Sequence, residues 1–206
     1  IQDLTEDLLK ISNILKKSFE KHEELHNQGK NKIIFEVIKN SIETFVRNEI
    51  DELKKGSVIK ILALETKIKT PLKLGSKEKV FLTGIIDRID EKNGIKRIID
   101  YKTGSIVSSQ LSVKELSLIC KDPGKSKAMQ LLCYSWMYMT NNNLDEVSTG
   151  IISFRSLKKG FMNLKVNTNE NSQLIKKGDI VFFENHLKEL IQEIMNPEIS
   201  FKERDT

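Results

Sequence analysis

The chain has 206 residues, of which 38% are hydrophobic and 31% charged, and its formal net charge is +5. These values are typical of one soluble domain with a sizeable core, with or without a helical appendage. Its longest apolar runs are too short to cross a membrane, and residues 1–20 do not have the pattern of a secretory signal. The small excess of Lys and Arg suits a polyanionic partner but does not by itself identify one.

The two cysteines, Cys120 and Cys133, have no neighbouring cysteines, so they form neither a metal-finger pattern nor a disulfide framework. We therefore predict a reducing, cytoplasmic setting. The chain begins at Ile1 with a polar helical pattern already under way, and we expect it to be a fragment of a longer protein.

The first quarter of the chain is predicted to be helical. Apolar residues recur at helical spacing over residues 3–20 and again over residues 33–53, and Gly56 then supplies a stop. We expect residues 1–54 to form an N-terminal helical segment that packs on a core domain covering residues 55–206.

After this stop the apolar residues follow the spacing of strands, with further helices between them. Strands are predicted over residues 58–66, 79–90, 96–101, 147–154 and 161–166. Helices are predicted over residues 112–119, 125–140 and 179–195. This mixture predicts an α/β fold in which a mixed central sheet of about five strands is flanked by helices.

A hairpin is predicted between the second and third strands, because Asn93-Gly94 accepts the positive φ angles of a tight turn. A turn at this point pairs residues whose numbers sum to about 187, which sets Asp87 directly opposite Asp100. Side chains alternate along a strand, so Lys102 shares the face of Asp100. The sequence therefore predicts two carboxylates and one ammonium at one point on the sheet.

An Asp-x-Lys sequence on a strand is most often an ion pair at the surface. Here two isoleucines precede both Asp87 and Asp100, which indicates buried strands, and buried carboxylates need partners. A divalent cation removes the repulsion between adjacent carboxylates, whose oxygens suit Mg²⁺ or Mn²⁺. Lys102 could orient or deprotonate a water, or stabilise charge on a phosphate, so we predict phosphodiester hydrolysis. Asp90, next to the turn, is interpreted as a turn residue only.

Three motifs follow one another along the chain: GIIDRID over residues 84–90, IIDYKTG over residues 98–104, and Q-x-x-x-Y from Gln130 to Tyr134. In this order they resemble the motifs of the RecB-like and AddB-like branch of the PD-(D/E)XK nuclease superfamily, over roughly residues 33–203. The resemblance implies a restriction-endonuclease-like core in which Asp87 and Asp100 bind the metal and Lys102 is catalytic.

The resemblance implies further site residues. The backbone carbonyl of Tyr101 would be another metal ligand. Gln130 and Tyr134 are four residues apart and share one helix face, which in this family borders the active site and the DNA. The alternative for Tyr134 is packing in the apolar stripe of the same helix.

The sequence departs from the family at one ligand, a His or Glu on an N-terminal helix, often in a G-x-x-x-H setting. His22 and His26 lie in a polar, lysine-rich stretch interpreted as a linker, and His186 is expected on the surface of the last helix. Glu65 ends the first predicted strand and is the remaining candidate ligand. Otherwise the missing ligand would lie upstream of Ile1.

Our sequence hypothesis is a Mg²⁺-dependent DNA nuclease domain, with exonuclease action in repair or recombination and a helicase domain or subunit as its partner. Lys125, Lys127 and Arg155 are candidate phosphate contacts. The alternative is a catalytically incomplete nuclease-fold module that binds DNA or the helicase partner. In a third interpretation the domain is purely structural, with Asp87 and Asp100 apart.

Overall fold

A computed structural model of the chain describes residues 10, 13–15, 17–18, 29–76, 78–166 and 173–200. Most of the predicted helix over residues 3–20, and both His22 and His26, lie outside the described residues. None of the helices within these ranges is long and apolar enough to cross a membrane.

A mixed sheet forms the centre of the fold, as predicted, and helices flank it. Its strands are β1 (Ile59–Lys73), β2 (Lys79–Lys92), β3 (Ile95–Lys102), β5 (Glu146–Ser153), β6 (Phe161–Asn163) and β8 (Ile175–Lys176). The order is β1-β2-β3-β5-β6, with β8 also paired to β5. The β3–β5 pair is parallel and every other pair in this sheet is antiparallel.

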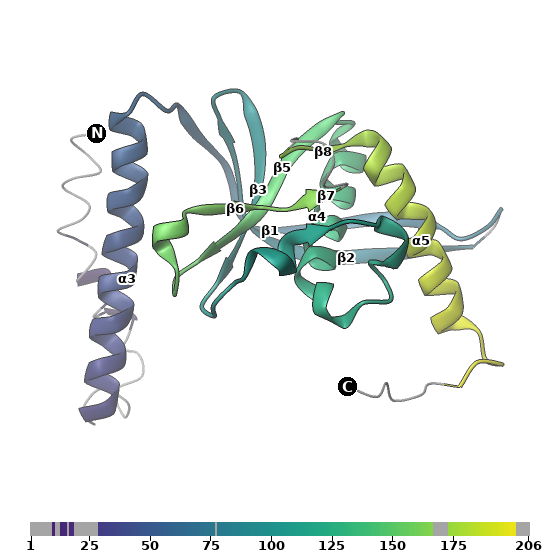
Figure 1. The fold of residues 1–206 in the computed structure, drawn as a ribbon, viewed down its shortest axis with the longest axis horizontal. Coiled ribbons are helices and arrows are strands. Elements are labelled where there is room, and N and C mark those ends of the chain that lie inside the picture. Colours follow the sequence, from purple (N-terminus) through teal and green to yellow (C-terminus); the bar gives the residue numbers. More distant parts are fainter. Residues whose placement is uncertain are drawn as a thin grey trace.

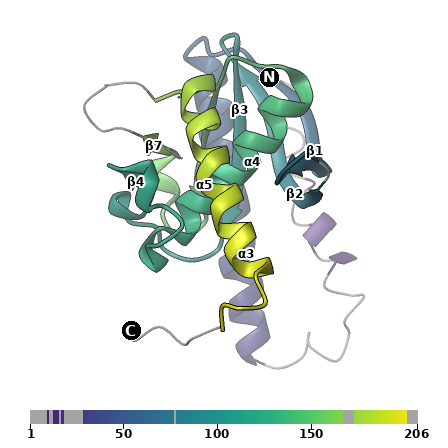
Figure 2. The ribbon, with the colours of Figure 1, turned by 90° about the vertical axis from the view of Figure 1, so that its right-hand side faces the viewer.

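Three helices lie on the two faces of this sheet. α3 (Gly29–Lys54) covers one face, while α4 (Ser126–Asn142) and α5 (Lys177–Met195) cover the other (Figures 1 and 2). The buried residues of α4, such as Leu132, Trp136 and Met139, recur at helical spacing and pack with α5 and the sheet in the main core. A smaller cluster around Ile99 and Phe45 lies between the sheet and α3.

Two predicted elements differ from those observed. The predicted helix over residues 112–119 is instead a short strand, β4 (Ser112–Val113), followed by the 3₁₀ turn η2 (Leu116–Leu118). The predicted strand over residues 161–166 is divided at Leu164, and its second part, β7 (Lys165–Val166), pairs with β4 in a separate parallel sheet. In both cases a tertiary strand pair that no local pattern indicates decides the structure.

The predicted register of the β2–β3 hairpin is confirmed. Arg88 pairs with Ile99 and Ile89 with Ile98, so the residue numbers of each pair sum to the predicted value. Asn93 has φ +52° at the turn, and its side chain accepts a hydrogen bond from the Val58 amide at 2.8 Å, which ties the turn to the start of β1.

The alternation of β2 changes at Asp87. Ile86 and Ile89 both pack in the main core, although strict alternation would place them on opposite faces. On β1 the residue between the pairs Leu64–Arg88 and Thr66–Ile86 is Glu65, which has φ +47°. This left-handed residue, rare inside a strand, accompanies the change and lets Arg88 reach the α3 side of the sheet.

A buried network of charges occupies that side of the sheet. Asp90 is 0% exposed and accepts two hydrogen bonds from Arg97, at 2.7 and 2.8 Å, while Arg88 lies 2.6 Å from it. Arg88 also donates to Glu49 of α3 at 2.8 Å. Burial opposes the charge on Arg88, yet Glu49 and Tyr101 outweigh it and raise the pKa of Arg88. The interpretation of Asp90 as a turn residue is therefore wrong: it is buried between Arg97 and Arg88, and Arg88 joins the sheet to α3.

We expect Asp90→Ala to lower the free energy of unfolding by about 3–5 kcal/mol, because it leaves two guanidinium groups buried without this carboxylate. Urea denaturation measures the change. The control is Glu52→Ala, whose pair with Lys92 is half exposed and should contribute no more than about 1 kcal/mol. Equal losses in the two variants would contradict a structural role for the network.

Candidate functional site

The candidate site lies where β2 and β3 separate. Their ladder ends at the pair Arg88–Ile99. Beyond it, the Asp87 carboxylate accepts a hydrogen bond from the backbone amide of Tyr101 at 2.7 Å. A side-chain oxygen of β2 thus takes the place that a backbone carbonyl would hold in a continued ladder, and it keeps Asp87 beside the end of β3.

Asp100 is buried next to this bond, with 3% of its surface exposed. The Lys102 ammonium donates to Oδ1 at 3.2 Å and lies 3.0 Å from Oδ2, but the second contact lacks hydrogen-bond geometry, so Oδ2 is buried without a donor. Burial raises the pKa of Asp100, the Lys102 ammonium lowers it, and the nearby Asp87 charge raises it again, with a net increase. Asp87 and Asp100 therefore interact electrostatically in this site.

Lys102 connects Asp100 to α4. Its ammonium donates to Gln130 Oε1 at 3.0 Å, and Gln130 Nε2 donates to the Tyr134 hydroxyl at 3.0 Å. The predicted helical pair thus lies directly over the strand pair. Gly84 on β2 makes this possible, because a Cβ atom there would lie 2.9 Å from the Tyr134 ring.

Tyr101 contributes only its backbone to this side of the sheet. Its ring packs against Phe45 of α3 and Phe154, each with a centroid separation of 5.7 Å, and its hydroxyl accepts from Arg88 at 3.4 Å. Burial raises the pKa of Tyr101, while Arg88 lowers it. Along β3, Asp100 and Lys102 therefore face the candidate site, and Tyr101 between them faces α3.

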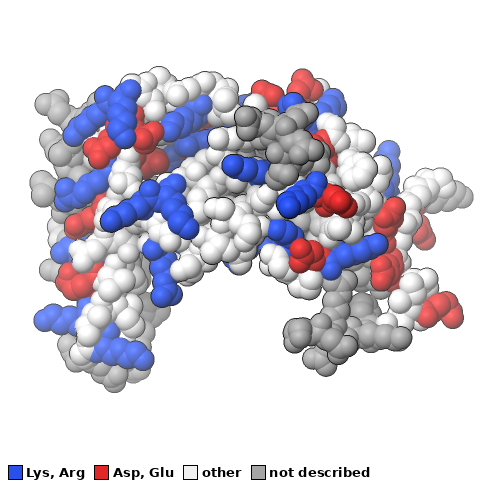
Figure 3. Space-filling view, in the orientation of Figure 1, with Lys and Arg blue, Asp and Glu red and all other residues white. Residues whose placement is uncertain are grey.

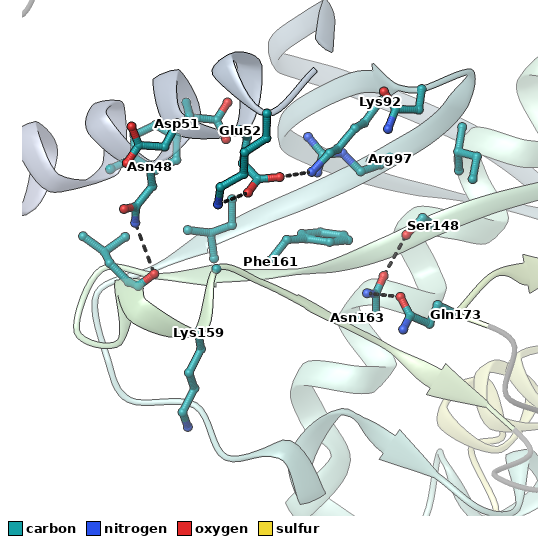
Figure 4. Close-up of a pocket in the computed structure, with 18 of the residues that line it drawn as sticks. Asn48, Asp51, Glu52, Lys92, Arg97, Ser148, Lys159, Phe161, Asn163 and Gln173 are labelled. Atoms are coloured by element: carbon teal, nitrogen blue, oxygen red, sulfur yellow. Dashed lines mark hydrogen bonds and ion pairs between the residues drawn. The ribbon is translucent and has the colours of Figure 1, made fainter. Parts of the chain in front are cut away.

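A large cavity lies on the other face and does not include the site. It measures about 860 Å³ and is bounded by α3, the β2–β3 turn, β6 and the 3₁₀ turn η4 (Leu157–Lys159). In Figure 4, the ion-paired Glu52 and Lys92 lie in the upper part of the view, and the hydrogen-bonded chain of Ser148, Asn163 and Gln173 lies at the lower right. The chemical grouping of carboxylates, ammonium and amide is better evidence of function than cavity size, and it lies elsewhere.

Charge on the visible face does not point to a single anion-binding patch. In the space-filling view, Lys and Arg side chains lie on α3 and across the middle of that face, interspersed with Asp and Glu on α3 and near α5 (Figure 3). The molecule is hollowed on its lower side in this view, between α3 and the part that carries α5.

The family model of the PD-(D/E)XK nuclease superfamily matches residues 2–206. The chain belongs to this superfamily. No curated protein matches the chain. Membership in a PD-(D/E)XK superfamily gives the observed grouping of Asp87, Asp100 and Lys102 a chemical context, because nucleases of this superfamily generally use divalent metals, typically Mg²⁺, and act on DNA.

The donor atoms fit such a metal in kind. Asp87 and Asp100 offer oxygen ligands, and the buried Oδ2 of Asp100 lacks the hydrogen bond that buried polar atoms normally have. The set is small: within the described ranges, no three His, Cys, Asp or Glu side chains are grouped so as to hold a metal ion. Glu65 stands near Asp87 in the register but is exposed.

The other sequence-predicted residues lie apart from this group. The Lys125 ammonium donates to the backbone carbonyls of Ser109 and Ser112, which gives it a structural contact. Arg155 is exposed beside a groove between α3 and η4. Lys127 is half-buried in the first turn of α4. Phosphate contacts by these three residues stay predictions. His186 pairs with Glu189 on α5, at 3.0 Å.

Sequence reasoning missed the residues that support the site from the α3 side, namely Glu49, Arg88, Asp90 and Arg97. One signal was present, because the register predicted to set Asp87 opposite Asp100 also pairs Asp90 with Arg97, as observed. Two opposite charges facing each other inside isoleucine-rich strands indicate a buried ion pair. Glu49 had no such signal, because its contact depends on how α3 lies on the sheet.

We expect Gly84→Ala to displace the Tyr134 ring and to lower the free energy of unfolding by about 1–3 kcal/mol, because the added methyl group overpacks the contact between β2 and α4. Urea denaturation measures the free energy of unfolding. Gly75→Ala is the matched control, since its Cβ would meet no atom within 4 Å, and it should change stability by less than about 1 kcal/mol. A Gly84→Ala protein as stable as wild type would contradict the close approach of Tyr134.

Proposed function

We propose that the chain is the catalytic domain of a Mg²⁺- or Mn²⁺-dependent deoxyribonuclease of the RecB-like and AddB-like branch, with Asp87 and Asp100 as metal ligands and Lys102 as the catalytic lysine. The observation that carries the proposal is the buried Oδ2 of Asp100, which has no hydrogen bond although it lies beside Asp87 and Lys102. A buried carboxylate oxygen of this kind is well suited to a cation.

Lys102 has the contacts that its proposed role needs. An ammonium has three N–H donors, and Asp100 and Gln130 accept two of them. With 29% of the side chain exposed, the third is free to donate to an attacking water or to a phosphate oxygen. The two fixed hydrogen bonds hold the amine in place, so that binding of substrate requires little reorganisation.

Gln130 and Tyr134 are proposed to orient this lysine. The Tyr134 hydroxyl accepts from Gln130 Nε2, which leaves Gln130 Oε1 directed at Lys102. A bound metal ion would supply Lewis-acid stabilisation of the phosphate and a water of lowered pKa. The backbone carbonyl of Tyr101 is proposed as a further ligand, because the amide of the same residue already binds Asp87.

Several finer features of the proposal come from the motif resemblance and not from the site's geometry. These are exonuclease action, a role in repair or recombination, and a helicase domain or subunit as partner. The cytoplasmic location is proposed from the two isolated cysteines, neither of which forms a disulfide.

A second function is favoured by one specific observation. In the described part of the chain only two acidic side chains meet at the site, and no third ligand completes a group. A nuclease-fold module that binds DNA or a helicase partner without cleaving would have such an incomplete set. Metal binding and cleavage therefore need separate measurements.

Metal binding is tested by thermal denaturation. A ligand that binds only the folded state at one hundred times its Kd stabilises by about 2.7 kcal/mol, so we expect Mg²⁺ or Mn²⁺ to raise the Tm and EDTA to reverse the rise. Asp100→Asn should abolish the response. Asp145→Asn, at an aspartate with 88% of its side chain exposed, should retain it. An equal rise in Tm in the two variants would contradict the proposal that Asp100 binds the metal.

Catalysis is tested with Lys102→Ala. We expect this variant to keep the Mg²⁺-dependent rise in Tm but to cleave DNA at least about 100-fold more slowly than wild type, because it lacks the donor beside the reacting phosphate. The assay follows fluorescent linear DNA with Mg²⁺ and with EDTA. If the wild-type chain binds metal normally but does not cleave DNA, the nuclease proposal is wrong for this chain and the binding module is the better function.

A further inference from the structure

The outer half of the β1–β2 hairpin carries an exposed face that the proposed site does not use. Its residues alternate with buried ones: Ile68 and Leu72 pack toward the main core, and the Thr70 hydroxyl donates to the Met137 carbonyl of α4. The intervening positions on both strands are all exposed. We call them the hairpin face, whose charged and large apolar members are Lys67, Lys69, Lys73, Lys79, Phe81 and Ile85.

The charge of the hairpin face is uncompensated. It has four lysines, and the two other positions, Pro71 and Thr83, bring no acidic group. Lys73 stands directly opposite Lys79 in the strand register, an arrangement that destabilises a sheet. None of the four lysines forms an ion pair with a carboxylate in the described ranges. This concentration of positive charge suits a polyanion.

An exposed aromatic ring lies among these lysines. Phe81 is 48% exposed, and the ammonium groups of Lys69 and Lys79 lie 4.3 and 5.6 Å from its ring centroid. Lysines on an edge strand oppose pairing with another chain, but that role does not explain an exposed Phe81 or Ile85 beside them. Aromatic rings among basic residues are the combination on which single-stranded nucleic acids bind, with bases on the ring and phosphates on the ammonium groups.

The position of the face relates it to the candidate site. It points away from α4 and so lies on the sheet face opposite the site. It ends at Ile85, two residues before Asp87, at the edge where β2 and β3 separate. From Lys79 to Ile85 the strand spans about 20 Å, which is long enough to contact several consecutive nucleotides of an extended single strand. We propose that the hairpin face binds a single nucleic-acid strand and directs it toward the sheet edge at which the site lies. That this strand is the substrate rests on the proposed function; the binding itself does not.

The test measures binding without cleavage. A 5′-fluorescein-labelled oligo-dT strand is titrated by anisotropy with the Asp100→Asn protein in EDTA, at salt concentrations from about 50 to about 200 mM NaCl. In that background, Lys69→Gln/Lys79→Gln should weaken binding at least about tenfold at low salt and reduce the slope of log K against log salt by about 1.4, the value for two phosphate contacts on a single strand. Phe81→Ala should weaken binding at least about fivefold.

A matched control distinguishes the loss of these particular lysines from a general loss of positive charge. Lys114→Gln/Lys165→Gln makes the same charge change at two exposed lysines beside the small β4–β7 sheet, and it should leave the affinity within about twofold of the parent. Circular dichroism melts show whether each variant is folded. An affinity unchanged by the hairpin substitutions, or equally lowered by the control, would overturn the inference.

Two further arms identify the ligand class and keep the inference distinct from the nuclease proposal. Anionic phosphatidylserine vesicles and poly-glutamate replace the oligonucleotide; binding of either with the same affinity and the same loss in the hairpin variants would overturn the assignment to nucleic acid. If the wild-type chain never cleaves DNA but loses strand binding in the hairpin variants, the inference stands and the proposed function fails. Metal-dependent cleavage with strand binding unchanged in the hairpin variants would support the proposed function and overturn the inference.

Discussion

The hydrogen bond from the Tyr101 amide to the Asp87 carboxylate is the interaction on which the site depends. It holds β3 against β2 at the point where their backbone ladder has ended, and so keeps Asp87 beside Asp100. The same residue, Tyr101, places its ring on the opposite face, against α3 and Arg88. Contacts on both faces of the sheet therefore hold the end of β3 in place and keep the two carboxylates close together. A bound cation would remove the electrostatic repulsion between them.

The sheet carries different chemistry on its two faces. On the α4 face, charged groups are few and incompletely bonded, as shown by the buried Oδ2 of Asp100. On the α3 face, both carboxylate oxygens of Asp90 accept hydrogen bonds from Arg97 and the Arg88 guanidinium pairs with it, although Arg88 Nε has no hydrogen-bond partner. A buried carboxylate whose two oxygens are both hydrogen-bonded stabilises the fold, whereas a carboxylate with one unbonded oxygen retains affinity for a cation. This contrast, more than cavity size, distinguishes the candidate site from the larger space beside α3.

Much of the fold could be predicted because its patterns are local. Asn93-Gly94 set the hairpin register, and that register also contains the Asp90–Arg97 pair, which the sequence hypothesis left unused. β1 extends to Lys73 and not to residue 66, although its alternation of apolar and lysine residues was visible in the sequence. The division at Leu164 and the contact of Glu49 with Arg88 could not be predicted, because they arise from packing between segments distant in the chain. At the site, the order of the motifs indicated which side chains lie together. It did not indicate that the Asp87 carboxylate accepts the hydrogen bond of the Tyr101 amide, in place of a backbone carbonyl of β2.

The central claim is that Asp87 and Asp100 together bind one divalent ion, and anomalous scattering from a crystal soaked in Mn²⁺ tests it most directly. We predict one strong peak within about 2.0–2.3 Å of a carboxylate oxygen from each residue, with Oδ2 of Asp100 among them. A peak at other carboxylates, or carboxyl groups of Asp87 and Asp100 that stay separately paired in saturating Mn²⁺, would contradict it.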